Sequence, residues 1–206
     1  MIDWDSCVLW LDNKYFGEYK WWDRSKYNND GVVYGAKWKE DSFYFDGVND
    51  AVNCGDNESL RIDDEISIEL LFIPYSKGYI VMKKNLSSWN NVYGAFWGYE
   101  GSNKIRFNGN NTNSIESLNV FYANEKQHVV ITAKQGDKTK FYKNGEFLNQ
   151  LSTPTFSGDG DALVVGARIE GSSYVWSIKA KIYYIRIFHK ILNEDEIKIL
   201  ARAAGV

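Results

Sequence analysis

The sequence predicts an all-β protein, an antiparallel β-sandwich that ends in one short helix. Two observations carry this prediction. Short runs rich in Val, Ile, Tyr, Phe and Trp recur along the 206 residues, and these residue types fit a pleated, half-buried surface. Gly and Asn separate the runs at intervals of about 8–12 residues, which is the spacing of short strands joined by turns. Only two prolines are present.

The clearest runs are predicted as strands at residues 42–45, 51–54, 66–74, 79–84, 93–100, 104–109, 128–134, 138–148, 162–169 and 179–189. Asn144 and Gly145 lie between two alternating arms and predict a type I′ hairpin turn. The segment KQGDK predicts a second tight turn. Asn193, with Glu196 three residues later, forms a capping-box pattern, so a short helix is expected to begin there and to end at Gly205.

The length suits a single domain, expected to span residues 1–206, because no internal repeat or linker interrupts the chain. Hydrophobic residues make up 44% of it, enough for a sizeable core, and eight Trp with 14 Tyr exceed what a core needs. We therefore expect some aromatic side chains at the surface. The net charge is −3 and no basic stripe is present, so nucleic acid is not an expected partner.

Cys7 and Cys54 leave two alternatives open, a disulfide bridge or two buried free thiols. No apolar run approaches the ~18 residues of a membrane span. The N-terminal segment MIDWDSCVLWLD lacks a basic region and carries three acids, so it is not a secretory signal. We expect the protein at an extracellular surface or on a virion. It is either part of a longer exported chain or leaves the cell by another route.

Five segments, in order, resemble the concanavalin A-like superfamily, and within it the laminin G-like, pentraxin-type domains. They are VLWLD with DRSKYNNDGVVYGA, FYFDGVNDAVNCG, ISIELLFIP, HVVITAKQGDKTKFYKNGEFL and KIYYIRIFHKILNEDEIKIL. The resemblance runs from Val8 to Leu200. It implies a two-sheet antiparallel jelly roll, and it says much less about function, because this fold hosts lectins, adhesion modules, glycanases and structural domains.

The corner DGVND has two interpretations. It is a turn, in which Gly47 supplies a positive φ and polar side chains bond nearby amides. Alternatively it is a calcium site, because Ca²⁺ takes carboxylate and carbonyl oxygens as ligands. The candidate ligands are Asp46, Asn49 and Asp50, with Asp23 and Asp30 in reserve. The resemblance implies a further acidic ligand from the last strand, where this chain has Tyr183. Calcium is thus a candidate cofactor, and the turn is the favoured interpretation.

The segment EISIE resembles the EIDIE strand of jelly-roll endoglucanases, in which two Glu flank an Asp. Glu65 and Glu69 share one strand face, and a retaining glycosidase needs two carboxyls about 5–5.5 Å apart. Here Ser67 replaces the central acid, and the laminin G-like pattern places Glu65 before the strand. His128 and His189 lie in apolar strand contexts without metal-ligand spacing. We therefore expect that the protein is not an enzyme.

The segment VYGAFWGYE is the most informative for function. Tyr93, Trp97 and Tyr99 alternate away from Phe96, so one strand face carries a row of large aromatic rings. If Phe96 faces the core, the row faces outward, where flat rings stack on sugars and Arg106 bonds hydroxyl groups. The alternative is that the row lines the interior, but the glycines beside Phe96 favour the exposed row. The candidate ligand-binding residues are Tyr93, Trp97, Tyr99, Arg106 and Trp89.

A second aromatic cluster, Tyr19, Trp21, Trp22 and Tyr27, is expected in the first long loop as a ligand rim or a subunit contact. Together these features favour a non-catalytic carbohydrate-binding or adhesion module on a virion or cell surface, with a glycan or glycoprotein as partner. The alternative is a structural or assembly domain, whose aromatic side chains bury against other subunits of a homo-oligomer or virion. A glycan hydrolase is the least favoured alternative.

Overall fold

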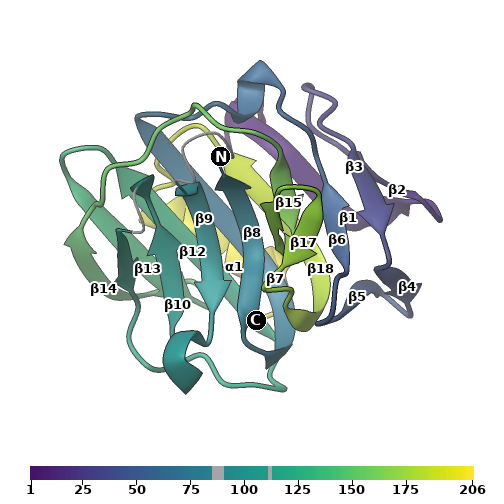
Figure 1. Ribbon diagram of the computed structural model, residues 1–206. Coiled ribbons are helices and arrows are strands. Elements are labelled where there is room, and N and C mark those ends of the chain that lie inside the picture. The colour runs from purple at the N-terminus through teal and green to yellow at the C-terminus, as the bar shows by residue number, and fades with distance from the viewer. Residues whose placement is uncertain (85–90, 111–112) are drawn as a thin grey trace.

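The computed structural model describes residues 1–84, 91–110 and 113–206, which form an all-β molecule with one short C-terminal helix (Figure 1). The described strands are β1 (Cys7–Phe16), β2 (Lys20–Asp23), β3 (Gly31–Tyr34), β4 (Lys37–Lys39), β5 (Ser42–Asp46), β6 (Ala51–Asn53), β7 (Glu65–Ser76), β8 (Gly78–Lys84), β9 (Asn91–Trp97), β10 (Ile105–Asn108), β11 (Ser114–Glu116), β12 (Gln127–Lys134), β13 (Lys138–Lys143), β14 (Glu146–Ser152), β15 (Leu163–Val165), β16 (Arg168–Glu170), β17 (Ser173–Val175) and β18 (Lys179–Phe188). The described helices are the 3-10 turns η1 (Trp4–Ser6), η2 (Glu58–Leu60) and η3 (Tyr99–Gly101) and the α-helix α1 (Glu194–Ala203).

Most of the described antiparallel strands join one 16-stranded hydrogen-bonded sheet, and β16 and β17 form a separate two-stranded sheet. The path through the larger sheet runs β11-β10-β9-β8-β15-β6-β3-β2-β1-β18-β7-β12-β13-β14, and β4 and β5 branch from β18. It folds so that β8, β9 and β10 lie in front of β7, β12 and β13 in Figure 1. Near its two ends, the Asn149 amide donates to the Glu116 carbonyl oxygen at 3.3 Å and accepts from the Leu118 amide at 3.1 Å. The result is a nearly closed sandwich.

The main core fills the space between the two layers. Strand β7 shows why the sequence folds this way, because its side chains alternate between the two faces. Ile66, Ile68 and Leu70 belong to the buried main core. Ser67 and Glu69 point to the other face and are buried there as well. A strand buried on both faces loses the simple apolar-polar alternation of a half-exposed strand.

Helix α1 covers part of that outer face. Asn193 accepts from the Glu196 amide at 3.0 Å and the Glu196 carboxylate accepts from the Asn193 amide at 3.0 Å, so the predicted capping box is confirmed. Ile197 and Leu200 pack in a cluster with Val130 of β12. The amphipathic pattern of the last segment therefore docks the helix on the back of the sandwich.

The two predicted hairpin turns are present in the structure. Asn144 and Gly145 have φ values of 53° and 85°, as a type I′ turn requires, and they join β13 to β14. Gly136, with φ of 73°, lies in the tight turn between β12 and β13. Both hairpin predictions are confirmed.

Of the two alternatives for the cysteines, the structure shows two free thiols. Cys7 and Cys54 are both buried and neither is in a disulfide. Burial raises the pKa of the Cys7 thiol to about 12, which leaves it protonated and unreactive at neutral pH. Within the described ranges, no helix has the length and apolarity needed to span a membrane.

Candidate functional site

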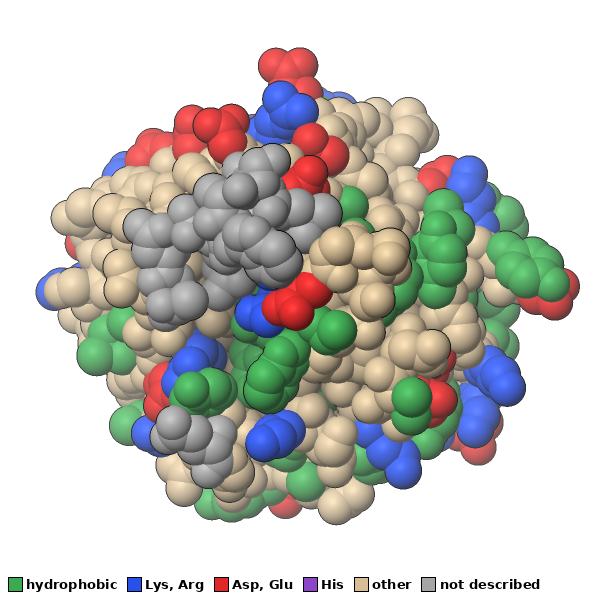
Figure 2. Space-filling model, in the orientation of Figure 1, with side chains coloured by type: hydrophobic (Ala, Val, Ile, Leu, Met, Phe, Trp, Pro, Cys, Tyr) green, Lys and Arg blue, Asp and Glu red, His purple; other side chains and the backbone are tan. Residues whose placement is uncertain are grey.

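A pocket of about 230 Å³ lies on the outer face of β8, β9 and β10, beside the β16–β17 hairpin. We call it the aromatic–arginine pocket. Its lining residues are Tyr79, Phe96, Tyr99, Arg106, Asn108, Arg168 and Trp176. Figure 2 shows this side of the molecule, where hydrophobic side chains lie directly beside Lys, Arg, Asp and Glu side chains. The pocket therefore combines flat apolar walls with polar groups, as small-ligand sites do.

Strand alternation decides which side chains reach this pocket. In β10, Ile105 and Phe107 are completely buried in the main core, so Arg106 and Asn108 point to the outer face. In β9, Phe96 takes the outer face and packs with Tyr79 of β8, with ring centroids 4.7 Å apart and planes at 86°. Neighbouring strands in register then bring these side chains together.

The prediction that Tyr93 and Trp97 form an exposed ligand-binding row is wrong. Both lie in the main core, where the Tyr93 hydroxyl donates to the Leu60 carbonyl at 2.8 Å. Trp97 Nε1 donates to the Phe121 carbonyl at 3.0 Å. The prediction interpreted Gly94 as leaving room for Phe96 in the core, but Gly94 has a different role. A Cβ there would lie 2.5 Å from a backbone oxygen of β8, so Gly94 serves close strand approach.

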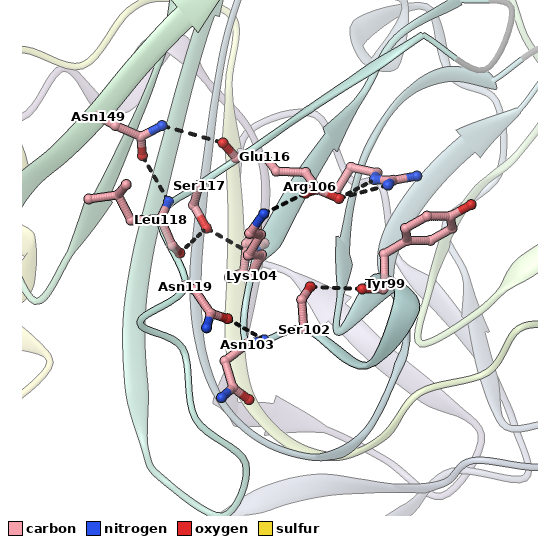
Figure 3. A network of polar contacts seen from close by, with 11 residues as sticks. Tyr99, Ser102, Asn103, Lys104, Arg106, Glu116, Ser117, Leu118, Asn119 and Asn149 are labelled. Atoms are coloured by element: carbon pink, nitrogen blue, oxygen red, sulfur yellow. Dashed lines mark hydrogen bonds and ion pairs between the residues drawn. The ribbon is translucent and has the colours of Figure 1, made fainter.

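Two of the predicted ligand-binding residues, Tyr99 and Arg106, do line the pocket. The Arg106 guanidinium carbon lies 3.3 Å from the centroid of the Tyr99 ring, which is 37% exposed (Figure 3). Such stacking fixes the guanidinium plane. The predicted residue Trp89 lies outside the described residues.

Glu116 of β11 holds the Arg106 side chain in place. Arg106 donates to Oε1 of Glu116 at 2.7 Å, and Lys104 donates to Oε2 at 3.2 Å (Figure 3). Burial opposes ionisation of Glu116, but these two hydrogen bonds outweigh it and hold the pKa of its carboxyl below the ordinary value. One carboxylate is therefore shared by two cations at the edge of the pocket.

On the opposite wall, Arg168 of β16 forms an ion pair with Glu170 and lies 3.3 Å from the Tyr79 hydroxyl. Glu170 also pairs with Lys84 at 3.5 Å. The side chain of Arg168 is mostly buried, so its orientation is fixed by these contacts. The β16–β17 hairpin thereby supplies a second positioned arginine.

Two buried donors of the pocket have no acceptor in the part of the chain that the structure describes. Asn108 is only 4% exposed, and its Nδ2 group finds no hydrogen-bond partner among the described residues. The same is true of Nε of Arg168. A buried donor without a partner costs about 1–3 kcal/mol, so native proteins rarely keep one without a reason. A bound ligand that accepts hydrogen bonds would supply that reason.

Trp176, at the mouth of the pocket, has an unusual backbone. Its φ is 53°, in the left-handed region that costs a non-glycine residue about 1–2 kcal/mol, and its side chain is 53% exposed. Close packing on either side holds it there. The Trp176 carbonyl accepts from the Tyr79 amide at 3.0 Å, and a Cβ at Gly78 would lie 2.5 Å from the backbone of Ile178. The fold thus holds an exposed indole at the pocket at a cost in free energy.

The DGVND corner is built as a turn. The Asp46 amide donates to Asp50 at 2.7 Å, and Asp46 accepts from the Val48 amide at 2.8 Å. Asp50 is buried, whereas Asp46 and Asn49 are exposed, and one carboxyl oxygen each of Asp46 and Asp50 is already engaged by an amide of the turn itself. Burial raises the pKa of the Asp50 carboxyl above its ordinary value.

The reserve ligands are also occupied by protein donors. Asp23 accepts from the amides of Trp10, Ser25 and Asn29 at 2.7, 2.9 and 2.8 Å, and Asp30 accepts from the Asp23 amide at 2.8 Å. Across the described ranges, no three His, Cys, Asp or Glu side chains gather as a metal site. These aspartates order the loop after β2.

The EISIE segment also has a structural role. Glu65 is the first residue of β7, not a loop residue, and pairs with Lys134 at 2.5 Å. Ser67 donates to the Lys190 carbonyl at 2.7 Å and accepts from the Leu192 amide at 2.9 Å. The residue that replaces the central acid therefore anchors the segment that leads into α1.

Glu69, the second candidate catalytic acid, is completely buried. Arg186 donates to both its oxygens at 2.9 and 3.0 Å, His128 Nε2 lies 3.0 Å from it, and the Tyr184 hydroxyl donates at 3.1 Å. Burial opposes ionisation of Glu69, but His128 and Arg186 outweigh it and keep the pKa of the carboxyl below its ordinary value. A carboxylate enclosed in this way has no contact with a solvent-borne substrate.

The second aromatic cluster does not form one surface. Trp21 is completely buried in the main core and its Nε1 donates to the Asp12 carbonyl at 2.7 Å. Tyr19 is exposed, Trp22 is 42% exposed, and Tyr27 packs partly against the core. The segment expected as a long loop contains the strands β2 and β3. Trp21 and Trp22 are neighbours in β2, so their side chains point to opposite faces of that strand.

The architecture defines the class of antiparallel β-sandwich proteins, and sequence comparison names the family. The family model described as the concanavalin A-like lectin/glucanases superfamily matches residues 46–198, most of the chain. The protein belongs to this superfamily. A search of curated protein sequences finds no match.

Solved structures show where else the fold occurs. A mutant of Trypanosoma rangeli sialidase displaying trans-sialidase activity is similar at a TM-score of 0.73 and 14% identity, covering 97% of this chain and 33% of that one. The binding domain of Paraclostridial Mosquitocidal Protein 1 has a TM-score of 0.73 and 16% sequence identity, covering 97% of this chain and 52% of that one. A botulinum neurotoxin type C structure has a TM-score of 0.71 and 18% sequence identity, covering 98% of this chain and 52% of that one. The chain thus spans about a third to a half of these proteins, and at such identities the similarity is one of fold.

Most of the pocket could not be predicted from sequence. Tyr79, Asn108, Arg168 and Trp176 come from segments with no motif and are brought together only by strand pairing. The sequence gives a partial signal at Phe96. Alternation along this strand places Tyr93 and Trp97 on one face and Phe96 on the other, so one of the two faces has to point outward. The prediction placed the wrong face outside.

Proposed function

We propose that the protein is a non-catalytic carbohydrate-binding module and that the aromatic–arginine pocket is its ligand site. One observation carries this proposal: a pocket with exposed aromatic walls contains a buried amide donor, Nδ2 of Asn108, that has no acceptor among the described residues. Sugars supply both complements, since their C–H faces stack on aromatic rings and their oxygens accept hydrogen bonds.

The pocket offers a distinct surface for each part of a sugar. The exposed indole of Trp176 and the ring of Tyr99 present flat apolar faces at its mouth. Arg106 and Arg168 are held by Glu116 and Glu170, so they are oriented before a ligand arrives. Preorganised groups lose little freedom on binding, which favours affinity.

The comparisons support this proposal at the level of the superfamily, whose description includes lectins. Among the proteins of similar fold, botulinum neurotoxin type C depends for cell entry on interaction with two ganglioside molecules, and this chain aligns with only about half of that structure. A Trypanosoma rangeli sialidase of similar fold has been solved in complex with sialic acid, and this chain covers 33% of that structure. Glu69 of this chain, however, is enclosed by Arg186 and His128, which argues against the EISIE carboxylates as a hydrolytic pair.

A glycan-array screen tests the proposal. Wild-type protein and the variant Trp176→Ala are compared, with Trp22→Ala as the matched control, since both indoles are about half exposed but only Trp176 lines the pocket. We expect the wild type and Trp22→Ala to bind the same glycans. Trp176→Ala is expected to lose at least tenfold in affinity.

Three results would overturn the proposal. Equal loss in both variants, or loss in Trp22→Ala alone, would move the site away from this pocket. A blank array with folded wild-type protein would favour the assembly role, in which exposed aromatic side chains bury against other subunits. Analytical ultracentrifugation of the same sample would then show a stable oligomer.

A further inference from the structure

The polar groups of the aromatic–arginine pocket are donors in excess. Its lining side chains carry the guanidinium groups of Arg106 and Arg168 and the amide of Asn108. At this pocket, the buried side-chain atoms that find no partner among the described residues are Nδ2 of Asn108 and Nε of Arg168, and both are donors. An unmet set of donors calls for a ligand group that only accepts. A hydroxyl group both donates and accepts, whereas a carboxylate accepts alone.

The acidic side chains near the pocket are already engaged. Glu116 accepts from both Arg106 and Lys104, so one carboxylate faces two cations. Glu170 pairs with Arg168 and with Lys84. Among these described side chains, positive charge therefore exceeds negative charge. This local excess stands out in a chain whose net charge is −3.

The shape of the pocket sets the size of the ligand group. Its volume of about 230 Å³ lies below the ~300–1,000 Å³ of pockets that hold drug-sized molecules. It therefore suits one sugar ring rather than several. The rings of Phe96, Tyr99 and Trp176 provide the apolar surface for that ring.

We propose that the pocket selects an acidic sugar, a single terminal residue whose carboxylate accepts hydrogen bonds from Asn108 and Arg168 and is attracted by Arg106. This inference rests on the proposed function and deepens it, because it names the ligand class of the same site. The rings of Phe96, Tyr99 and Trp176 contact the sugar ring, and the donors of Asn108 and Arg168 hydrogen-bond its carboxylate.

Matched ligands separate the acid from the rest of the sugar. Isothermal titration compares 3′-sialyllactose, a terminal glucuronic acid disaccharide, the methyl ester of each, lactose, and lactose 3′-sulfate. We expect at least one carboxylate sugar to bind ten times or more tightly than its own methyl ester. The sulfate probe distinguishes a general anion site from a carboxylate site, and we expect it to bind more weakly than the acid.

Matched variants locate the effect. Arg168→Gln and Asn108→Leu are expected to reduce the preference for acid over ester at least fivefold. Arg24→Gln is the control, because Arg24 also stacks on aromatic rings and pairs with a carboxylate, Asp12, yet does not line the pocket. Thermal unfolding confirms that each variant is folded. If Arg168→Gln is not folded, the charge-retaining Arg168→Lys is used in its place.

The outcomes are distinct. Equal binding of acid and ester at this pocket would overturn the acidic-sugar inference while leaving the glycan-binding function intact. Tighter binding of the sulfate would also overturn it, in favour of a general anion site. Absence of binding by every acidic and neutral glycan would overturn the proposed function itself.

Discussion

At the scale of single residues, the pocket carries two local costs that the fold does not need. Trp176 occupies a left-handed backbone conformation, and the Asn108 amide is buried without an acceptor among the described residues. Strain and unmet polar groups concentrate at functional sites, because selection for binding can outweigh selection for stability. Both costs therefore yield tests that separate binding from folding.

Replacing Trp176 by Gly and by Ala isolates the strain. Both variants lose the stacking surface, so both are expected to bind glycan at least tenfold more weakly. Glycine adopts a φ of 53° without a steric penalty, so Trp176→Gly is expected to exceed Trp176→Ala by about 1 kcal/mol in free energy of unfolding. Urea denaturation measures the difference. Equal stability of the two variants would show that the backbone is not strained.

Replacing Asn108 by Leu removes a donor that none of the described residues satisfies. The variant is expected to keep its stability or to gain up to ~1 kcal/mol, since the desolvation cost of the amide disappears. The control is Asn29→Leu, because the buried Asn29 amide donates to the Val8 carbonyl at 2.6 Å and to Ser59 at 2.8 Å. Asn29→Leu is expected to lose about 2 kcal/mol. Similar losses in both would make Asn108 a structural residue.

At the scale of elements, local chemistry was predictable and the choice of strand face was not. The Asn144-Gly145 turn and the Asn193 capping box are set by neighbours in sequence, and both predictions are confirmed. The sequence also predicts the alternation in β9, but alternation only says that two faces differ. Which face is buried depends on the layer behind it, and the hydrogen-bond partner of Tyr93, Leu60, lies in a distant segment.

The capping box gives an element-scale prediction. Asn193→Ala leaves the Glu196 amide without its side-chain acceptor and is expected to lower the free energy of unfolding by about 1 kcal/mol. Helix α1 covers the back of the sandwich, away from the aromatic–arginine pocket, so glycan affinity is expected to remain unchanged. Denaturation and titration of the same variant check both parts. A loss of binding would indicate that the helix acts on the site.

At the scale of the whole molecule, the two faces of the sandwich have different roles. The back carries a buried charged network around Glu69, which ties β7 to β12 and β18. The front carries the pocket, whose residues come from β8, β9, β10, the β16–β17 hairpin and the turns beside them. The superfamily resemblance predicts the sandwich correctly. It does not predict the pocket, because members share the frame while their sites differ.

The buried network predicts acid sensitivity. Glu69 has a lowered pKa in the folded protein, so its contribution to stability is present above the ordinary Glu value of 4.5 and is lost as pH falls through the folded value. Glu69→Gln leaves Arg186 without its anion and is expected to cost about 3 kcal/mol at pH 7. The difference in free energy of unfolding between the wild type and Glu69→Gln is expected to be smaller at pH 3 than at pH 7. A difference that stays constant with pH would contradict a charged Glu69.

The location of the ligand is the central claim, and the indole N–H spectrum of the eight tryptophans tests it most directly. An acidic or neutral glycan taken from the array is titrated into ¹⁵N-labelled protein, with Trp176 assigned through Trp176→Phe. We expect the Trp176 resonance to shift saturably while those of Trp4 and Trp22, exposed elsewhere, stay fixed. Shifts confined to Trp4 or Trp22, with Trp176 unmoved, would contradict the aromatic–arginine pocket as the binding site.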